Sequence, residues 1–306
     1  MLTHNYNYAA ALADSVKIAW QVNDLIGGDK RLDFTKPFLP EPLAQVRGLT
    51  MLREPERLLL NQIRGNSYLH LFGFVEEFIL PFVTDEARAS MLGGDPIEVR
   101  AMMTFAEEEA KHIHLFRRFA EEFAAGFPVP CEVVGPAPEV ARDVLSHSRL
   151  GIALLTLHLE WMTQSHYLES VKDDQDLDPL FKSLLRHHWM EEAQHAKLDT
   201  LLVDKLAREG GPAAIAQAFE DFEALGTAID GLLARQAELD LHALQAAAER
   251  TLSDADRTHI IAAQTRAYRY TFLASGLQTK NFLTTVEQLS PGSAEKMRGL
   301  ARALVD

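Results

Sequence analysis

Two five-residue segments decide how this chain folds: EEAKH at residues 108–112 and EEAQH at residues 191–195. In each segment the second glutamate stands three residues before the histidine. At this spacing two side chains leave an α-helix about 60° apart, so they lie on one face. The residues that share this face are apolar in both segments, which predicts that each carboxylate and imidazole points into a core.

The two pairs, Glu109–His112 and Glu192–His195, favour a metal site over a solvated charged surface. An ionised carboxylate on a core face costs several kcal/mol unless it is paired or bound to a metal. Two such pairs on separate helices make a coincidence improbable. The repeated pattern therefore predicts metal ligands.

A metal site in a four-helix bundle also needs one carboxylate from each of the other two helices. Apolar and small polar residues surround Glu160 on its helix, so Glu160 is the expected inward acid there. In the first helix Glu76 and Glu77 compete. Periodicity favours Glu76, because Glu77 shares a polar side with Asn66 and His70.

The expected ligand set holds four carboxylates and two imidazoles: Glu76, Glu109, His112, Glu160, Glu192 and His195. Such a set suits two iron ions, with manganese as the alternative, better than zinc, which prefers four ligands, or calcium, which avoids imidazole. Glu108 and Glu191 each precede a ligand glutamate. We expect each of them to accept a hydrogen bond from a ligand histidine on the facing helix.

The fold predicted from helical periodicity is all-α. The expected helices cover residues 55–84, 96–125, 138–172, 177–209, 213–250 and 254–289. Four prolines exclude a helix in the segment GFPVPCEVVGPAP at residues 126–138, which could reach roughly 43 Å when extended. This length suits the long crossover of a ferritin-like four-helix bundle.

The expected organisation is one domain with three parts. Residues 1–54 form a lead-in, residues 55–211 form the ferritin-like metal-binding core, and residues 212–306 form C-terminal helices packed on that core. The break at Gly210, Gly211 and Pro212 separates the last two parts.

Composition narrows the class of protein. The chain has 30 Lys and Arg against 44 Asp and Glu, a net charge of −14, which disfavours nucleic acid and anionic lipid as partners. No run approaches the roughly 20 apolar residues of a membrane span, and the best, IALLTLHLEWM at residues 152–162, contains Glu160. With a single cysteine, Cys131, and no basic region at the N-terminus, we expect a reduced, cytoplasmic protein.

The helix order Glu, Glu-x-x-His, Glu, Glu-x-x-His resembles the ferritin-like di-iron carboxylate superfamily over about residues 55–209. His188 stands four residues before Glu192 and extends the last motif to His-x-x-x-Glu-x-x-His, whereas Phe105 stands at the equivalent place in the second helix. This asymmetry is similar to the p-aminobenzoate N-oxygenase family, in which the additional histidine binds one iron and aryl amines are oxygenated with O₂. The resemblance implies that His188 is a seventh ligand.

The function expected from these observations is an O₂-activating di-iron oxygenase that oxygenates the nitrogen of an aromatic or other small amine. Its partners would be O₂, the small-molecule substrate, an external electron donor and a second copy in a homodimer. One alternative is a di-iron C–H hydroxylase or desaturase, since the same metal core supports both reactions. Another is non-catalytic iron storage or metal binding, for which the helices after residue 211 would be surplus.

Overall fold

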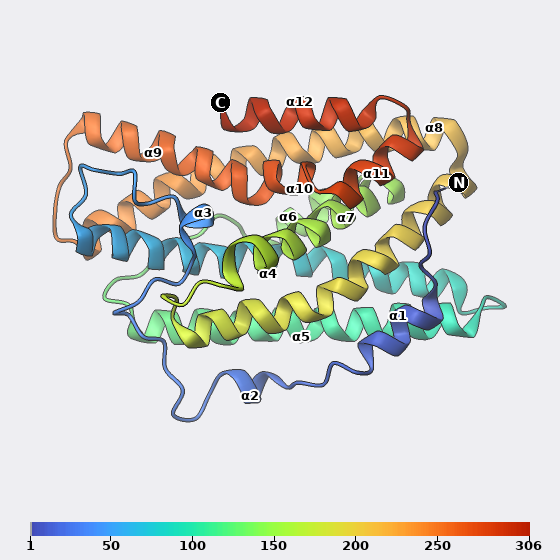
Figure 1. Ribbon diagram of the computed structural model, residues 1–306, viewed down its shortest axis with the longest axis horizontal. Coiled ribbons are helices and arrows are strands. Elements are labelled where there is room, and N and C mark those ends of the chain that lie inside the picture. Colours follow the sequence, from blue (N-terminus) through green and yellow to red (C-terminus); the bar gives the residue numbers. More distant parts are fainter. Residues whose placement is uncertain (1) are drawn as a thin grey trace.

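The computed structural model describes residues 2–306, and this part of the chain contains helices and no strand, which confirms the predicted all-α class (Figure 1). The lead-in holds three short helices, α1 (Tyr8–Ser15), α2 (Val22–Leu25) and α3 (Glu41–Ala44). The long helices of the bundle are α4 (Glu54–Ser90), α5 (Pro96–Gly126), α7 (Arg149–His166) and the first part of α8 (Pro179–Ala247). None of the helices described here combines the length and apolar character needed to cross a membrane.

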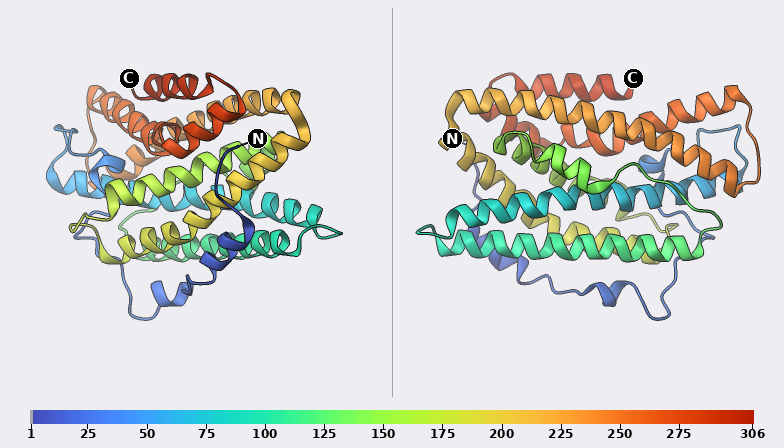
Figure 2. Two further views of the ribbon diagram at one scale, coloured as in Figure 1. Left: turned by 45° about the vertical axis from the view of Figure 1, so that its right-hand side comes forward. Right: turned by 180° about the vertical axis from the view of Figure 1, so that it is seen from behind.

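The bundle consists of two helix pairs joined by a crossover. α4 packs along α5, α7 packs along α8, and α8 also contacts α4 and α5. Residues 127–148 connect the pairs and return along the bundle, so that α7 runs in the same direction as α5 (Figure 2). This connectivity confirms the ferritin-like bundle with a long crossover. The crossover is not extended throughout, because α6 (Ala137–Val144) forms within it and packs on α4.

A second layer of helices covers the bundle beside α7. α8 bends at the expected break, where Gly211 has φ 66° and ψ −166°, a conformation that favours glycine. Pro212 begins the next helical turn, where a missing N–H is tolerated. Residues 212–247 then run back above the bundle (Figure 1). The layer is completed by α9 (Asp254–Arg269), η2 (Tyr270–Ala274), α10 (Ser275–Leu277), α11 (Lys280–Leu289) and α12 (Ser293–Val305).

Two of the predicted helices are interrupted in the structure, and a third helix had no predicted bounds. The helix expected over 138–172 breaks at 145–148, because the side chain of Ser148 caps α7 by accepting the N–H of Gly151 at 3.2 Å; α7 then ends in a π-helical turn, η1 (Tyr167–Val171). The helix expected over 254–289 breaks between α10 and α11. Within the C-terminal helices expected over residues 212–306, no bounds were given for a helix after residue 289; α12 begins beyond Gly292, whose positive φ of 86° turns the chain back.

The irregular lead-in is fixed to the bundle by side-chain hydrogen bonds. The Asn61 side chain on α4 accepts the N–H groups of Phe38 at 2.7 Å and Leu39 at 3.1 Å, and it donates to the Leu39 carbonyl at 2.7 Å. α1 and α2 pack against α5 and α8. The lead-in therefore covers the side of the bundle where the two EExxH segments lie.

Candidate metal centre

The bundle helices bring the predicted ligands into one buried cluster. α4 supplies Glu76, α5 supplies Glu109 and His112, α7 supplies Glu160, and α8 supplies His188, Glu192 and His195. Each of the seven is at most 3% exposed. The cluster therefore lies in the interior, as expected from the apolar faces that carry these residues.

Glu192 lies at the centre of the cluster, within reach of all three histidines. Its Oε1 is 2.6 Å from His188 Nε2 and 3.1 Å from His112 Nδ1. Its Oε2 is 2.9 Å from His195 Nδ1. One carboxylate thus has an oxygen on each of two sides, which is the arrangement of a ligand shared between two metal ions.

Two groups of four ligand atoms form around this centre, the atoms of each group lying within 4.8 Å of one another. One group is Glu76, His112, His188 and Glu192, and the other is Glu109, His112, Glu192 and His195. Glu160 belongs to neither group, although it is buried and the charge of Glu192 acts on it.

Several close approaches in the cluster lack hydrogen-bond geometry. His112 Nδ1 and Glu192 Oε1 are buried 3.1 Å apart, and neither has a hydrogen-bond partner. Both oxygens of Glu109 are also buried without a partner. Metal–ligand bonds of about 2.1 Å at right angles place neighbouring ligand atoms roughly 3 Å apart. Buried N and O atoms at this spacing, each costing about 1–3 kcal/mol if left unsatisfied, fit a pair of cations.

The outward ring nitrogens of two histidines bond to carboxylates across the helix pair. His112 Nε2 on α5 lies 2.9 Å from Glu191 Oε2 on α8, and His195 Nε2 on α8 lies 2.9 Å from Glu108 Oε2 on α5. Each carboxylate accepts the imidazole proton, so that Nδ1 of each ring faces the cluster. Glu191 also accepts from Lys111 Nζ at 2.5 Å.

The carboxylates reverse the effect of burial on the histidines. Burial opposes the charged imidazolium, but the charge of Glu192, the hydrogen bond to Glu191 and the close contact with Glu192 outweigh it and raise the pKa of His112 to about 9. The same balance raises the pKa of His195 well above its usual value. Burial, followed by the charge of Glu192, raises the pKa of Glu160 well above the usual range. The cluster thus attracts positive charge, which a pair of metal ions would supply.

Helix phase separates the predicted ligands from their neighbours in sequence. Glu77 lies at the surface, 22% exposed, with its Oε1 2.7 Å from Arg117 Nη2. Glu76 points inward, and its Oε1 is 3.1 Å from His188 Nε2. The ring of His187 turns away from the cluster, and its Nδ1 lies 2.7 Å from the Ser183 carbonyl.

Asp199 is a buried acid near the cluster that the sequence analysis missed. It is fully buried, both its oxygens lack a hydrogen-bond partner, and burial raises its pKa well above the usual range. Its position four residues after His195 and seven after Glu192 places it on the same face of α8. This spacing is the signal that could have identified it.

No family model and no curated protein matches the chain. Among solved structures, a variant of an R2-like ligand-binding oxidase with an aerobically reconstituted Mn/Fe cofactor aligns over 87% of this chain and 93% of its own, at 14% identity and a TM-score of 0.48. A variant with an aerobically reconstituted Fe/Fe cofactor aligns over the same shares at 15% identity and a TM-score of 0.49. This likeness concerns the helical architecture and carries no information on ligands or substrate.

Proposed function

We propose that the chain is an O₂-activating dimetal oxygenase that N-oxygenates an aromatic or other small-molecule amine. The observation that carries the dimetal assignment is the pair of four-atom groups that share Glu192, buried in the bundle with unpartnered nitrogen and oxygen atoms. Nitrogen and carboxylate donors of this kind suit iron or manganese. Two such ions, when bound side by side, would supply electrons to O₂.

The ligand roles follow from the distances. Glu76 and His188 would hold one ion, Glu109 and His195 the other, and Glu192 would join both. His112 has one free nitrogen and would serve one of the two ions. Glu160, which is 3% exposed and lies in neither four-atom group, would complete the set by a rotation of its side chain.

The residues outside the ligand set would fix the imidazoles and limit access of water. Glu108 and Glu191 hold the outward protons of His195 and His112. Trp20 of the lead-in is 5% exposed and stacks on the His112 ring at a centroid distance of 6.2 Å. The site is therefore closed on the side of the lead-in.

The choice of an amine rests on His188 and the family resemblance, because a fold and a metal core do not select a substrate. Conversion of an amine to a hydroxylamine inserts one oxygen atom of O₂ into an N–H bond. The other oxygen leaves as water, which takes two protons and two electrons, so an external electron donor is required. The two alternatives differ from an N-oxygenase in their products. A C–H hydroxylase would oxidise C–H bonds, and a storage protein would accumulate mineral without an organic product.

The test begins with metal analysis of the full-length protein from cells supplied with iron and manganese. We expect about two ions per chain, as in dimetal carboxylate bundles. The reduced protein is then mixed with oxygenated buffer and a panel of amines, phenols and fatty acids, and products are followed by mass. Oxygen gained on an amine supports the proposal. Oxidation confined to C–H bonds indicates a hydroxylase, mineral accumulation without product indicates storage, and one zinc ion per chain overturns the dimetal assignment.

A further inference from the structure

A cavity of about 650 Å³ opens between α4, α5 and the start of the crossover. Small-molecule sites in proteins enclose about 300–1,000 Å³ and are mainly apolar. The lining of this cavity is of that kind and includes Leu69, Phe74, Ile113, Phe116, Phe123 and Phe127. The cavity therefore has the size and character of a ligand site.

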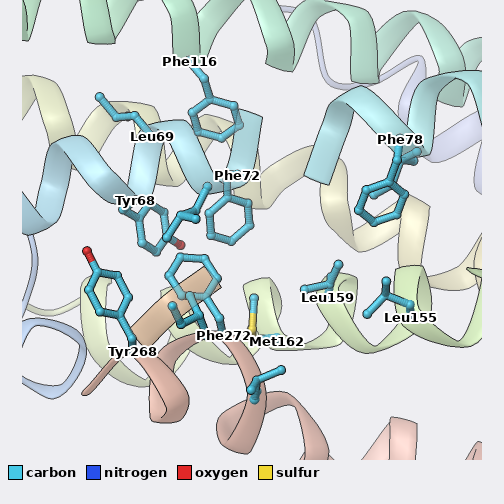
Figure 3. Close-up of a cluster of buried hydrophobic side chains, with 14 of the residues drawn as sticks. Tyr68, Leu69, Phe72, Phe78, Phe116, Leu155, Leu159, Met162, Tyr268 and Phe272 are labelled. Atoms are coloured by element: carbon cyan, nitrogen blue, oxygen red, sulfur yellow. The ribbon is translucent and has the colours of Figure 1, made fainter. Parts of the chain in front are cut away.

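The floor of the cavity lies next to the candidate metal centre. Phe116 and Leu69 line the cavity and are each only 1% exposed, so they form its deep end. The ring of Phe116 meets the ring of His188 edge to face at a centroid distance of 5.0 Å. Figure 3 shows Phe116 on α5 projecting toward Phe72 and Leu69 on α4. A single aromatic side chain thus separates the cavity from His188.

The polar groups of the cavity carry little unbalanced charge. Arg117 and Glu77 both line it, and they neutralise each other through their 2.7 Å contact. Burial lowers the pKa of His70, so its ring is neutral and offers one donor and one acceptor. Asn66, which is 3% exposed, adds an amide near the floor. These groups favour a neutral, largely aromatic ligand with one or two hydrogen-bonding atoms over an anion.

We infer that this cavity binds the organic substrate of the dimetal site, and that the substrate is an uncharged aromatic molecule with a hydrogen-bonding group. This inference rests on the proposed function. The aromatic lining would hold the body of the molecule, Asn66 and His70 would bond its polar atom, and Phe116 would separate the bound molecule from the metal ligand His188.

Two glycines offer a matched test. Gly73 lines this cavity, and Gly226 lines a separate cavity of about 270 Å³ in the second layer. Both lie within helices, and a Cβ added at either position meets no atom within 4 Å. Gly73→Phe should fill the cavity, whereas Gly226→Phe places the same ring at a comparable position elsewhere.

The probe is 1-aminoanthracene, a neutral aromatic amine whose fluorescence rises in apolar surroundings, titrated into the full-length metal-loaded protein. We expect Gly73→Phe to weaken probe binding at least about 10-fold and Gly226→Phe to leave it unchanged, with equal metal content in both. Unchanged binding in Gly73→Phe would overturn the inference. If the protein binds no metal or does not react with O₂, but Gly73→Phe still abolishes probe binding, the cavity is a ligand site and both its substrate role and the oxygenase proposal fail.

Competition tests the chemical class. Aniline should displace the probe at a concentration about 10-fold lower than 4-aminobenzoate does, because burial of a carboxylate is costly when Arg117 is already paired. A stronger effect of 4-aminobenzoate would show that Arg117 leaves Glu77 to bind anions, and would overturn the assignment of an uncharged ligand.

Discussion

Histidines are buried in two regions of this molecule, and their surroundings differ. In the candidate metal centre, neighbouring carboxylates raise the pKa of His112 to about 9 despite its burial. Where α7 meets the second layer, burial lowers the pKa of His158 to about 4 and that of His166 to about 3. His158 Nε2 lies 3.3 Å from the Phe272 carbonyl, and His166 Nε2 lies 3.0 Å from Ser275 Oγ. Burial of an imidazole is therefore common to both regions, and the carboxylates distinguish the metal centre.

The largest expected effect is loss of metal when His112, which lies within reach of both candidate ion positions, is removed. His112 belongs to both four-atom groups, so His112→Ala should reduce the metal content from about two ions per chain to well below one. His158→Ala removes an equally buried imidazole from the second region and should leave the metal content unchanged. Both are measured by elemental analysis of the folded protein. Equal metal content in the two variants would contradict the distinction between the regions.

The next effect concerns the carboxylates that hold the outward protons of the histidines. Glu191→Gln should weaken metal affinity about 10–100-fold, because the amide orients and polarises His112 less well. Glu86, 4% exposed and bonded to Arg149 at 2.6 Å, is a buried acid away from the cluster, so Glu86→Gln is the control. Competition with a fluorescent chelator measures both. An equal loss in the two variants would indicate a general effect of removing a buried charge.

The helical core and the burial of the seven candidate ligands could be predicted from the sequence because both depend on local periodicity. Glu76 was separated from Glu77 only by the residues on its face, and the structure buries Glu76 while it leaves Glu77 at the surface. Asp199 was missed because the pattern of the first EExxH segment does not extend to it: Phe116, four residues after His112, stands at the corresponding position. A comparison of the two EExxH segments therefore finds no shared acidic residue after the histidines.

Features that depend on how distant segments meet could not be predicted. The cavity exists because residues 127–131 close over α4 and α5, and no periodicity encodes that contact. The Nε2 atoms of His158 and His166 bond to Phe272 and Ser275, more than a hundred positions along the chain. The breaks around α6 and α10 likewise follow from packing and capping rather than from propensity.

A smaller effect is expected in the pH dependence of stability. The unfolded chain binds a proton at His166 below pH 6.5, whereas the folded chain does so only near pH 3. The stabilisation from a neutral His166 is therefore present above pH 6.5 and is lost as the pH falls toward 3, at roughly 1.4 kcal/mol per pH unit. The loss in stability caused by His166→Gln should thus shrink between pH 7 and pH 5.

Urea unfolding of the metal-free protein at several pH values measures this difference. His114→Gln, at an exposed position, is the control for loss of an imidazole. A difference between wild type and His166→Gln that stays constant with pH would show that His166 is not held neutral by burial.

The smallest effect concerns Asp199, which lies on the same face of α8 as Glu192 and His195 but, unlike His158 and His166, has no hydrogen-bond partner. Both its oxygens are buried without hydrogen bonds, so Asp199→Ala should raise the stability of the metal-free chain by about 1 kcal/mol. Nearby metal ions would stabilise the ionised carboxylate of Asp199. Asp199→Ala should therefore gain less stability than wild type when metal is added.

Asp178 is the control for Asp199, because it is a buried acid whose oxygens have hydrogen-bond partners. It is 1% exposed, but its oxygens accept the N–H groups of Phe181 at 2.6 Å and Asp33 at 3.0 Å. Asp178→Ala should therefore lower stability by about 1 kcal/mol, with or without metal, because it removes a helix cap. The melting temperatures of both variants, each measured with metal and after chelation, test this difference. If Asp199→Ala loses stability in the metal-free chain, this carboxylate has a structural partner and does not belong to the metal centre.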